Sequence, residues 1–288
     1  VASASHIYGL GTVDAESFTT WRRWKDGPHD LKKHVDRAFC EGLNAVTLVA
    51  FANTRPEHGL PGRAIHAGSD FNTATTWWQQ AKPFMDYMSR CSYMLAQGLF
   101  AADVAYYYGD KAPNFFPEYQ GDPDRPRLKG LSAGYDFDVV NTDVIINRMT
   151  VSDGKVTLPD GLNYKLLVLP HRDDIPEYVV SKVEELIAAG ANVLVQHPEI
   201  AKTIKGNVIK NNSIDEALEK LSIAKDFTCD EDKLDFIHRK IGDADFYFVR
   251  NLTDKFIIEK CAFRVVGKQP EYWDLVTDKQ YNILNSKM

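Results

Sequence analysis

Short runs of consecutive apolar residues, separated by amphipathic segments, constrain the fold of this chain more than any other feature of its sequence. The run KLLVL at 165–169 is continuously apolar after its first residue, as in a strand buried on both faces of a sheet. Residues 176–189 follow with apolar side chains at helical spacing, and 192–196 is a second buried strand. Strand, helix and strand in this order predict an open parallel sheet of the doubly wound kind.

A similar alternation occupies the first part of the chain. We expect an apolar strand that leads into a loop at 6–20, an amphipathic helix at 27–42 and a second buried strand at 44–51. This order again implies that the two strands pair in parallel. The loop at 52–72 is rich in polar and turn residues, and its length favours a binding function over a purely connecting one.

A long helix is expected after this loop. It would begin at Thr73 or Thr75, bend early at Pro83 and end at Gly98, with an apolar stripe along one side. The composition changes near residue 99, where a new buried strand begins. We therefore place a domain boundary at that point.

Turn signals predict antiparallel structure in two later places. Asp153-Gly154 and Asp160-Gly161 are turn sequences that predict a small hairpin before the strand at 165–169. Residues 246–251 and 256–263 predict two further strands, joined to each other as a hairpin by the short turn between them. These two strands are expected to open an antiparallel β module.

Composition and charge exclude several classes of protein. The 288 residues include 34 basic and 40 acidic side chains, a net charge of -6 without a basic cluster, so nucleic acid is not expected as a partner. No apolar run approaches the roughly 18 residues of a membrane span. No Gly-rich phosphate loop and no metal-ligand spacing occurs, so we expect neither a cofactor nor a metal.

The four cysteines carry less information. Cys40, Cys91, Cys229 and Cys261 lie far apart and form no C-x-x-C pair, which argues against a zinc knuckle or a redox motif of that type. Their spacing leaves open both free thiols and disulfide pairing.

Glu16 is the best single candidate for a catalytic side chain. It lies just past the end of an expected strand, and the carboxyl ends of parallel strands gather catalytic groups. Asp14 lies two residues before it. A carboxylate there suits a general base or nucleophile in glycoside hydrolysis. The structural alternative is a carboxylate that caps the next turn, which predicts a buried Glu16 hydrogen-bonded to backbone.

Aromatic and loop residues near this strand are candidates for sugar binding. The ring faces of Trp21 and Trp77 suit the C–H surface of a sugar, although tryptophans near helix starts also serve as core residues. His58 and His66 lie in the long loop among charged residues, a mixture suited to the hydroxyl groups of a sugar or to a carboxylate, although most loop histidines are merely solvated.

Several short motifs, taken in order, resemble glycoside hydrolases of family 106, the α-L-rhamnosidase type. Each motif alone is weak, and their common order over roughly residues 6–200 carries the resemblance. The motifs include AESFT at 15–19, EGLN at 41–44, TWWQQAKP at 76–83, GYDFD at 134–138 and YKLLVLP at 164–170. At Val49-Ala50 the chain departs from the family pattern, where a histidine is usual, and this departure leaves the substrate undefined.

The resemblance implies an α/β fold in three parts. Residues 1–99 would be the C-terminal portion of a TIM barrel, with its last strands and helices. Residues 100–240 would form a flavodoxin-like domain with a doubly wound parallel sheet, and 241–288 would be the start of an antiparallel β-sandwich.

The same resemblance implies an inverting enzyme that acts on an oligosaccharide or glycoside. Glu16 would be the general base, and the general acid would lie in the remainder of the parent polypeptide, so this chain alone is expected to be inactive. A periplasmic or extracellular location follows from the resemblance alone. The implied sugar-binding rim comprises Asn53, His58, His66, Asn72 and Trp77.

Three alternatives remain beside this hypothesis. A β-galactosidase-like hydrolase would share the order of domains but retain the anomeric configuration. A noncatalytic carbohydrate-binding or structural module would need no catalytic carboxylate. An amidotransferase-like activity of residues 100–225 is disfavoured, because no cysteine nucleophile follows the strand at 192–196.

Overall fold

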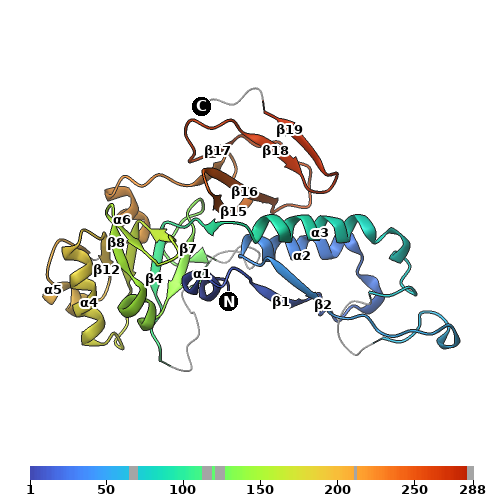
Figure 1. Cartoon of the computed structure of the whole chain (residues 1–288), viewed down its shortest axis with the longest axis horizontal. Coiled ribbons are helices and arrows are strands. Elements are labelled where there is room, and N and C mark those ends of the chain that lie inside the picture. The colour runs from blue at the N-terminus through green and yellow to red at the C-terminus, as the bar shows by residue number, and fades with distance from the viewer. Residues whose placement is uncertain (65–70, 112–118, 121–126, 211–212, 284–288) are drawn as a thin grey trace. The chain divides into compact units, whose positions relative to one another are not determined.

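The chain is a mixed α/β protein with both parallel and antiparallel sheets (Figure 1). It divides into two compact units: unit 1 comprises residues 1–11 and 98–264, and unit 2 comprises residues 12–97 and 265–288. The computed structural model describes residues 1–64, 71–111, 119–120, 127–210 and 213–283.

Unit 1 contains a five-stranded parallel sheet in the order β13-β12-β11-β4-β7. Every residue of β4, β11 and β12 is buried, which is why these strands are continuous apolar runs in the sequence. The strands predicted at 165–169 and 192–196 are thereby confirmed. The bounds are Val104–Tyr107 for β4, Phe137–Val140 for β7, Leu166–Leu169 for β11, Val193–Val195 for β12 and Ile209–Lys210 for β13.

Helices α4 (Glu177–Ala188), α5 (Pro198–Thr203) and α6 (Ile214–Lys220) follow the later strands of this sheet. Helix α4 confirms the helix predicted at 176–189 and buries its apolar stripe. Helix α6 begins at a capping box formed by Ser213 and Glu216. Its buried side chains pack with one face of the sheet in a cluster that includes Val104, Leu166, Leu194, Ile214 and Leu218.

The first residues are helical, so the apolar strand predicted from residue 6 is wrong at its start. Helix α1 (Ala2–Tyr8) ends at Gly9, whose φ of 69° is the left-handed conformation that glycine favours. The helix packs against β7, where His6 Nδ1 lies 3.0 Å from Asp138 Oδ1 and the Ser3 hydroxyl accepts the Val139 amide at 3.1 Å. These contacts with β7, a strand distant in the sequence, stabilise the helical conformation of residues 2–8.

A small three-stranded antiparallel sheet confirms the hairpin predicted from the turn sequences. Strands β8 (Thr150–Ser152), β9 (Lys155–Thr157) and β10 (Asn163–Tyr164) pair in chain order. Asp153 and Gly154 form the first turn with φ values of 50° and 72°, a pair of positive angles that favours these residue types.

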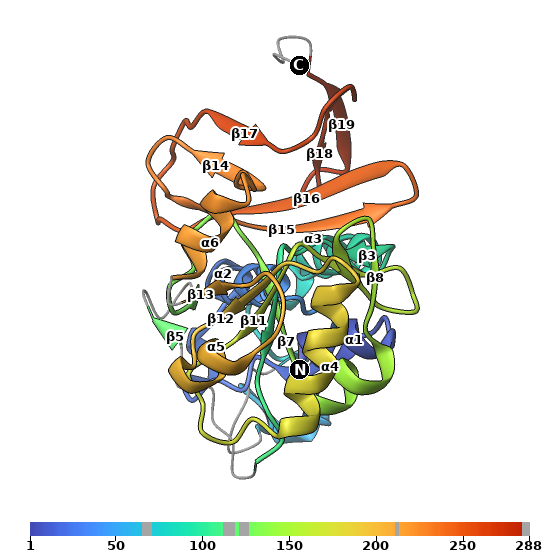
Figure 2. The same ribbon diagram turned by 90° about the vertical axis from the view of Figure 1, so that its left-hand side faces the viewer.

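The second predicted hairpin pairs with different partners from those expected. Strand β16 (Ala244–Asn251) pairs with β15 (Leu234–Ile241), and the two run side by side as a long hairpin (Figure 2). Strand β17 (Cys261–Phe263) instead pairs with β14 (Phe227–Cys229). The direct hairpin between 246–251 and 256–263 is therefore wrong.

The lengths of strands β15 and β16, and the loop that follows β16, explain why β16 pairs with β15. Strands β15 and β16 are eight residues each, so their pairing satisfies far more backbone groups than a short hairpin would. Beyond β16, the Asn251 side chain accepts the Thr253 amide at 2.8 Å and donates to the Lys255 carbonyl at 2.8 Å. These bonds hold a loop rather than a strand-to-strand turn. Strand β3 (Leu99–Phe100) pairs with the other edge of β15.

Unit 2 confirms the predicted parallel strand-helix-strand pattern. Strand β1 (Asp14–Ser17) pairs in parallel with β2 (Ala45–Leu48), and helix α2 (Pro28–Cys40) connects them. Helix α2 starts with proline in its first turn, as the sequence predicts. Strand β2 is half-buried or exposed, so the expectation that it is buried on both faces is wrong for this chain.

The helix predicted from Thr73 or Thr75 starts later than expected. Helix α3 (Lys82–Leu95) begins with Pro83 in its first turn, where a proline needs no helical hydrogen bond, so Pro83 starts this helix rather than bending it. Within the described residues, three short 3-10 turns precede helix α3. A separate two-stranded antiparallel sheet lies near the C-terminus. Their bounds are Arg23–Lys25 for η1, Pro56–His58 for η2, Trp78–Gln80 for η3, Glu271–Asp274 for β18 and Lys279–Asn282 for β19.

Helices α2 and α3 pack together through apolar and polar contacts. The Tyr87 hydroxyl donates to Asp36 Oδ1 at 2.6 Å, and Lys32 lies over the Tyr87 ring at 4.3 Å. Burial, followed by the charge of Asp36, raises the pKa of Tyr87 far above its ordinary value. Tyr87 therefore stays a neutral donor between the helices.

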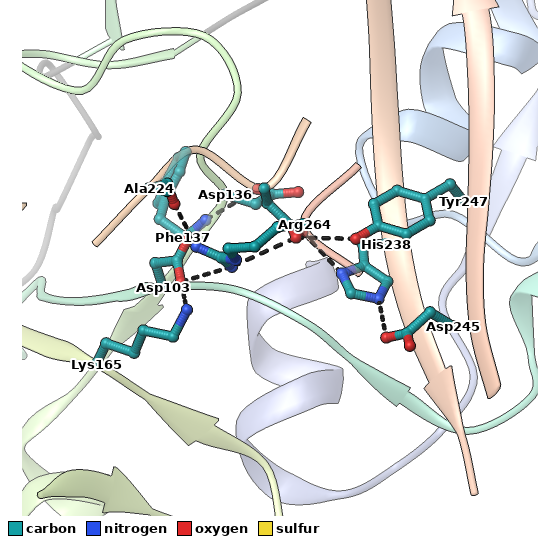
Figure 3. A network of polar contacts seen from close by, with 10 residues as sticks. Asp103, Asp136, Phe137, Lys165, Ala224, His238, Asp245, Tyr247 and Arg264 are labelled. Atoms are coloured by element: carbon teal, nitrogen blue, oxygen red, sulfur yellow. Dashed lines mark hydrogen bonds and ion pairs between the residues drawn. The ribbon is translucent and has the colours of Figure 1, made fainter. Parts of the chain in front are cut away.

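A network of buried charges joins the antiparallel strands of unit 1 to its parallel sheet (Figure 3). Arg264, just after β17, binds the carboxylate of Asp103 in bidentate fashion, at 2.9 and 3.1 Å. Its guanidinium also lies 3.3 Å from Asp226 Oδ1. Asp103, which precedes β4, lies a further 2.8 Å from the ammonium of Lys165, which precedes β11. Four segments of the chain thus meet around one arginine.

The network continues into the β15–β16 hairpin through His238. Its Nδ1 lies 2.7 Å from Asp226 and its Nε2 lies 2.8 Å from Asp245 (Figure 3). The Tyr247 hydroxyl donates to Asp226 at 2.9 Å. Burial by itself would raise the pKa of Asp226, but the hydrogen bond and charge of His238 and the charge of Arg264 outweigh it and lower that pKa.

Replacing Arg264 should destabilise unit 1. In Arg264→Leu, the buried carboxylates of Asp103 and Asp226 lose their shared counter-charge, while Lys165 and His238 still compensate in part. We expect the free energy of unfolding to fall by about 2–3 kcal/mol, measured by urea denaturation. The matched control Arg55→Leu, at an exposed ion pair, should change it by less than about 0.5 kcal/mol. Equal effects would contradict this account.

Asp226 should contribute a pH-dependent part of the stability. Because its folded pKa is lowered, its contribution is complete above the unfolded value of about 3.9 and disappears as the pH falls through the folded value. Asp226→Asn should therefore lose about 2 kcal/mol at neutral pH, and its stability should fall less steeply than that of the wild type below about pH 4. Urea unfolding at a series of pH values tests this, with the 99% exposed Asp173→Asn as control. Parallel curves would disprove it.

Candidate active site

Glu16 lies on β1 with its side chain in solvent. Strands β1 and β2 are parallel, and Glu16 is in register with Thr47 close to the carboxyl ends of both. The Thr19 hydroxyl, in the loop after β1, donates a hydrogen bond of 3.1 Å to Glu16 Oε1. The carboxylate is thus oriented by a hydroxyl and accessible to solvent, whereas a purely structural cap would be buried against backbone amides.

Asp14 is the second carboxylate on the same face of β1, two residues earlier. It accepts a hydrogen bond of 2.8 Å from the hydroxyl of Thr47 on β2. Asp14 is therefore tied to the neighbouring strand, and Glu16 to the loop that follows its own strand. Asp14 and Glu16 therefore lie in different environments, although both are exposed carboxylates of one strand.

The residues predicted to bind a sugar lie in different surroundings. Trp21 is 74% exposed, and Asn53 is exposed as well. His58 is half-buried, and its Nδ1 accepts the Arg55 amide at 2.9 Å, so one ring nitrogen caps the short helical turn η2. His66 lies outside the described residues.

Asn72 and Trp77 are held in unit 2 by hydrogen bonds to backbone groups. Asn72 is only 1% exposed, and its Oδ1 accepts the Ala74 amide at 2.9 Å. The Trp77 indole donates to the Asp26 carbonyl at 3.2 Å, and its ring packs edge-on against Phe71 at 5.7 Å. These contacts position Trp77 as a support for the segment after η1.

Three buried polar atoms in the described part of unit 2 stand out because they have no hydrogen-bond partner. They are the side-chain atoms Trp24 Nε1, Asp26 Oδ2 and Asn72 Nδ2. The other carboxylate oxygen of Asp26 pairs with Arg22 at 3.1 Å. A buried polar atom without a partner costs about 1–3 kcal/mol, so each of these atoms is an unusual feature of the fold. The only sequence signal for Trp24 and Asp26 is their position in the loop after β1.

The chemical character of these three atoms is mixed. Trp24 Nε1 and Asn72 Nδ2 are donors, and Asp26 Oδ2 is an acceptor when ionised. A hydroxyl group both donates and accepts hydrogen bonds. The three atoms therefore include both kinds of hydrogen-bonding group with which a hydroxyl can pair.

Two further features concern metal binding and membrane-spanning helices. In the described ranges, no cluster of three or more His, Cys, Asp or Glu side chains is arranged to hold a metal ion. None of the helices that the structure describes is long and apolar enough to cross a membrane.

Comparison with known proteins shows a consistent relationship. The sequence model of a family described as alpha-L-rhamnosidase, Glyco_hydro_106, matches residues 1–204 and 199–286, which confirms the resemblance seen in the short motifs. A curated protein of Formosa agariphila, named putative beta-glucuronidase, is 33% identical over 297 residues. This similarity covers 95% of the present chain and 24% of that protein, so the chain spans about a quarter of the relative's length.

Solved structures show the same relationship in three dimensions. A rhamnosidase from Novosphingobium sp. PP1Y superposes with a TM-score of 0.81 and 26% identity, covering 98% of this chain and 30% of that one. A GH42 β-galactosidase superposes with a TM-score of 0.58 and 11% identity, covering 98% and 55% of the two chains. The second similarity is one of fold alone.

The indole hydrogen bond of Trp77 should stabilise unit 2. Trp77→Phe keeps an aromatic ring next to Phe71 but leaves the Asp26 carbonyl without its donor. We expect a loss of about 1–2 kcal/mol in the free energy of unfolding, measured by urea denaturation. Trp21→Phe is the matched control, because its ring is exposed, and should change stability by less than about 0.5 kcal/mol. A control as damaging as the test variant would refute the assignment.

Proposed function

The chain belongs to the glycoside hydrolase family 106, described as alpha-L-rhamnosidase, and we propose that it carries the general base of an inverting hydrolase of this type. The observation that carries the proposal is Glu16, an exposed carboxylate near the carboxyl end of a parallel strand pair, oriented by Thr19. Catalytic carboxylates of parallel α/β enzymes lie at this edge.

In this mechanism Glu16 removes a proton from a water molecule as the water attacks the anomeric carbon. A general acid on the opposite side of the sugar protonates the leaving oxygen, and the configuration at that carbon inverts. The two carboxyl groups lie about 6.5–9.5 Å apart in such enzymes, which leaves room for the water. We assign the acid to the remainder of the parent polypeptide, so the present chain should be inactive alone.

The sugar would be bound by the loops that follow β1 and β2. The unsatisfied buried atoms of Trp24, Asp26 and Asn72 offer two donors and one acceptor for hydroxyl groups. The exposed ring of Trp21 offers a stacking surface, and Asn53 and His58 lie in the loop after β2. The proposed binding residues are Trp21, Trp24, Asp26, Asn53, His58 and Asn72. Trp77 instead supports the segment after η1.

We further propose that residues 1–99 contribute the last strands and helices of a (β/α)8 barrel. Strand β1, helix α2, strand β2 and helix α3 follow one another as two successive β/α units, and β1 pairs in parallel with β2. This order supports the barrel assignment.

The parallel sheet of unit 1 supports a flavodoxin-like domain. Numbered along the chain, its strands lie side by side in the order 2-1-3-4-5, which is the flavodoxin-like arrangement. We propose that the antiparallel strands near the C-terminus begin a β-sandwich. The β15–β16 hairpin spans residue 241, the boundary expected from the sequence, and so belongs to that module as one piece.

The curated relative provides a second candidate substrate. Its name, putative beta-glucuronidase, refers to a sugar with a carboxylate, which arginine binds well. Arg22, which pairs with one carboxylate oxygen of Asp26 and whose side chain is 61% exposed, is one cation of this region that could bind such a carboxylate. A retaining β-galactosidase-like reaction would instead place its two carboxyl groups about 5–5.5 Å apart. For either activity we propose a periplasmic or extracellular location, as for exported glycan-degrading enzymes.

Substitution of Glu16 in the full-length protein tests the proposal. Glu16→Gln should lower kcat on an aryl α-L-rhamnoside by about 10²–10⁴-fold, because the amide cannot accept the proton of water. The matched control Asp14→Asn, on the same face of β1, should lower it by less than about tenfold. Both variants should unfold at the temperature of the parent within a few degrees.

The same experiment identifies the substrate and the stereochemistry of the reaction. An aryl β-glucuronide assayed beside the rhamnoside separates the two candidate substrates, and NMR of the first-formed sugar distinguishes inversion from retention. A Glu16→Gln variant as active as its parent would remove Glu16 from the mechanism. Retention of configuration would show that the reaction is of the β-galactosidase-like class.

A further inference from the structure

Two of the four cysteines are direct partners across an antiparallel strand pair. Strands β14 and β17 pair with Phe227 opposite Phe263 and Cys229 opposite Cys261. More than thirty residues separate the two cysteines in the sequence, so only the strand pairing brings them together. Both are free thiols in the structure.

The hydrogen-bond pattern shows which kind of pair they form. Antiparallel partners alternate between hydrogen-bonded pairs and non-hydrogen-bonded pairs, in which the Cα atoms lie closer, at about 4.5 Å. The Arg264 amide donates to the Asp226 carbonyl at 2.9 Å, so this position is a hydrogen-bonded one. Counting along the register from it, Cys229 and Cys261 fall on a non-hydrogen-bonded position. That Cα separation lies within the range that a disulfide spans, about 4.4–6.8 Å.

The side chains on this face of the strand pair do meet. Cys229 and Cys261 lie two residues from Phe227 and Phe263 and therefore on the same face as these rings, whose centroids are 5.2 Å apart. Burial raises the pKa of Cys261, and the charge of Cys229 raises it further, so alkaline pH favours the reactive thiolate.

The two thiols are also accessible to a reagent. Cys261 is exposed and Cys229 is half-buried, whereas Cys40 and Cys91 are buried in unit 2. Burial raises the pKa of Cys91 to about 12, which makes its thiolate scarce. The chain therefore contains its own unreactive control cysteines.

We propose that Cys229 and Cys261 form a redox site that closes into a cross-strand disulfide when the protein meets a disulfide oxidant. The Cys261 thiolate attacks one sulfur of the oxidant and releases its other sulfur as a thiol. The Cys229 thiolate then attacks Cys261 Sγ and displaces the second thiol. The two cysteines lose two protons and two electrons, and the oxidant's disulfide is reduced to two thiols.

The bond would stabilise the antiparallel part of unit 1. It closes a loop that contains the whole β15–β16 hairpin, and a closed loop of this length restricts the unfolded chain. It also holds β17 on β14 three residues before Arg264, the centre of the buried charge network. An oxidising compartment would favour the closed form.

Thiol trapping and peptide mapping test the proposal on the folded chain. The protein is incubated with excess oxidised glutathione at mildly alkaline pH, and the remaining thiols are alkylated after denaturation. We expect two of the four cysteines to escape alkylation and a peptide that links Cys229 to Cys261. Cys229→Ser should abolish the link, whereas Cys40→Ser should leave it intact. Four alkylated cysteines after oxidation, or a link between other cysteines, would overturn the proposal.

Thermal unfolding provides the second measurement. Oxidation should raise the Tm of the wild-type chain by roughly 5–10 °C, and a reductant should reverse the rise. The Tm of Cys229→Ser should not respond to either treatment. A mapped Cys229–Cys261 bond without a change in Tm would overturn the stabilising effect.

Discussion

The position of Arg264 between two buried carboxylates is the interaction on which the architecture of unit 1 depends. Asp103 and Asp226 belong to distant segments, and neither could be buried as an anion without a shared cation. Lys165 and His238 extend the compensation into the parallel sheet and the β15–β16 hairpin. Desolvation consumes much of the Coulomb attraction in such a network, so removing one partner costs more than the intact network contributes.

The candidate active site of unit 2 is organised by a different principle. Its polar groups lie near the carboxyl ends of two short parallel strands. Glu16 is exposed and accepts a hydrogen bond from a single hydroxyl, whereas Asp14 is bonded to Thr47 of β2, so the two carboxylates of one strand have different environments. Trp24, Asp26 and Asn72 each have a buried polar atom without a hydrogen-bond partner, which costs free energy of folding.

The sequence predicted part of this site and missed another part for identifiable reasons. The sequence predicts Glu16 just past the end of a strand, and the structure places it within β1, one residue before the end of that strand. For Trp24 and Asp26 the sequence signal is only their position in the loop after β1, because burial without a hydrogen-bond partner depends on every neighbouring side chain. Trp77 shows the reverse case. Its aromatic ring suits stacking, and the structure shows in addition that its indole donates to the Asp26 carbonyl, a contact that the sequence does not reveal.

Local pattern alone determined the buried parallel strands, helices α2 and α4, and the turn at Asp153-Gly154. Burial on both faces requires continuous apolar runs, and helices and tight turns depend on residues close in sequence. The tertiary structure decided the partners of β16 and β17, the helical form of residues 2–8, and the meeting of Cys229 with Cys261. Strands of similar composition can pair in several ways, and the choice among them depends on the sum of long-range contacts, which no short stretch of sequence contains.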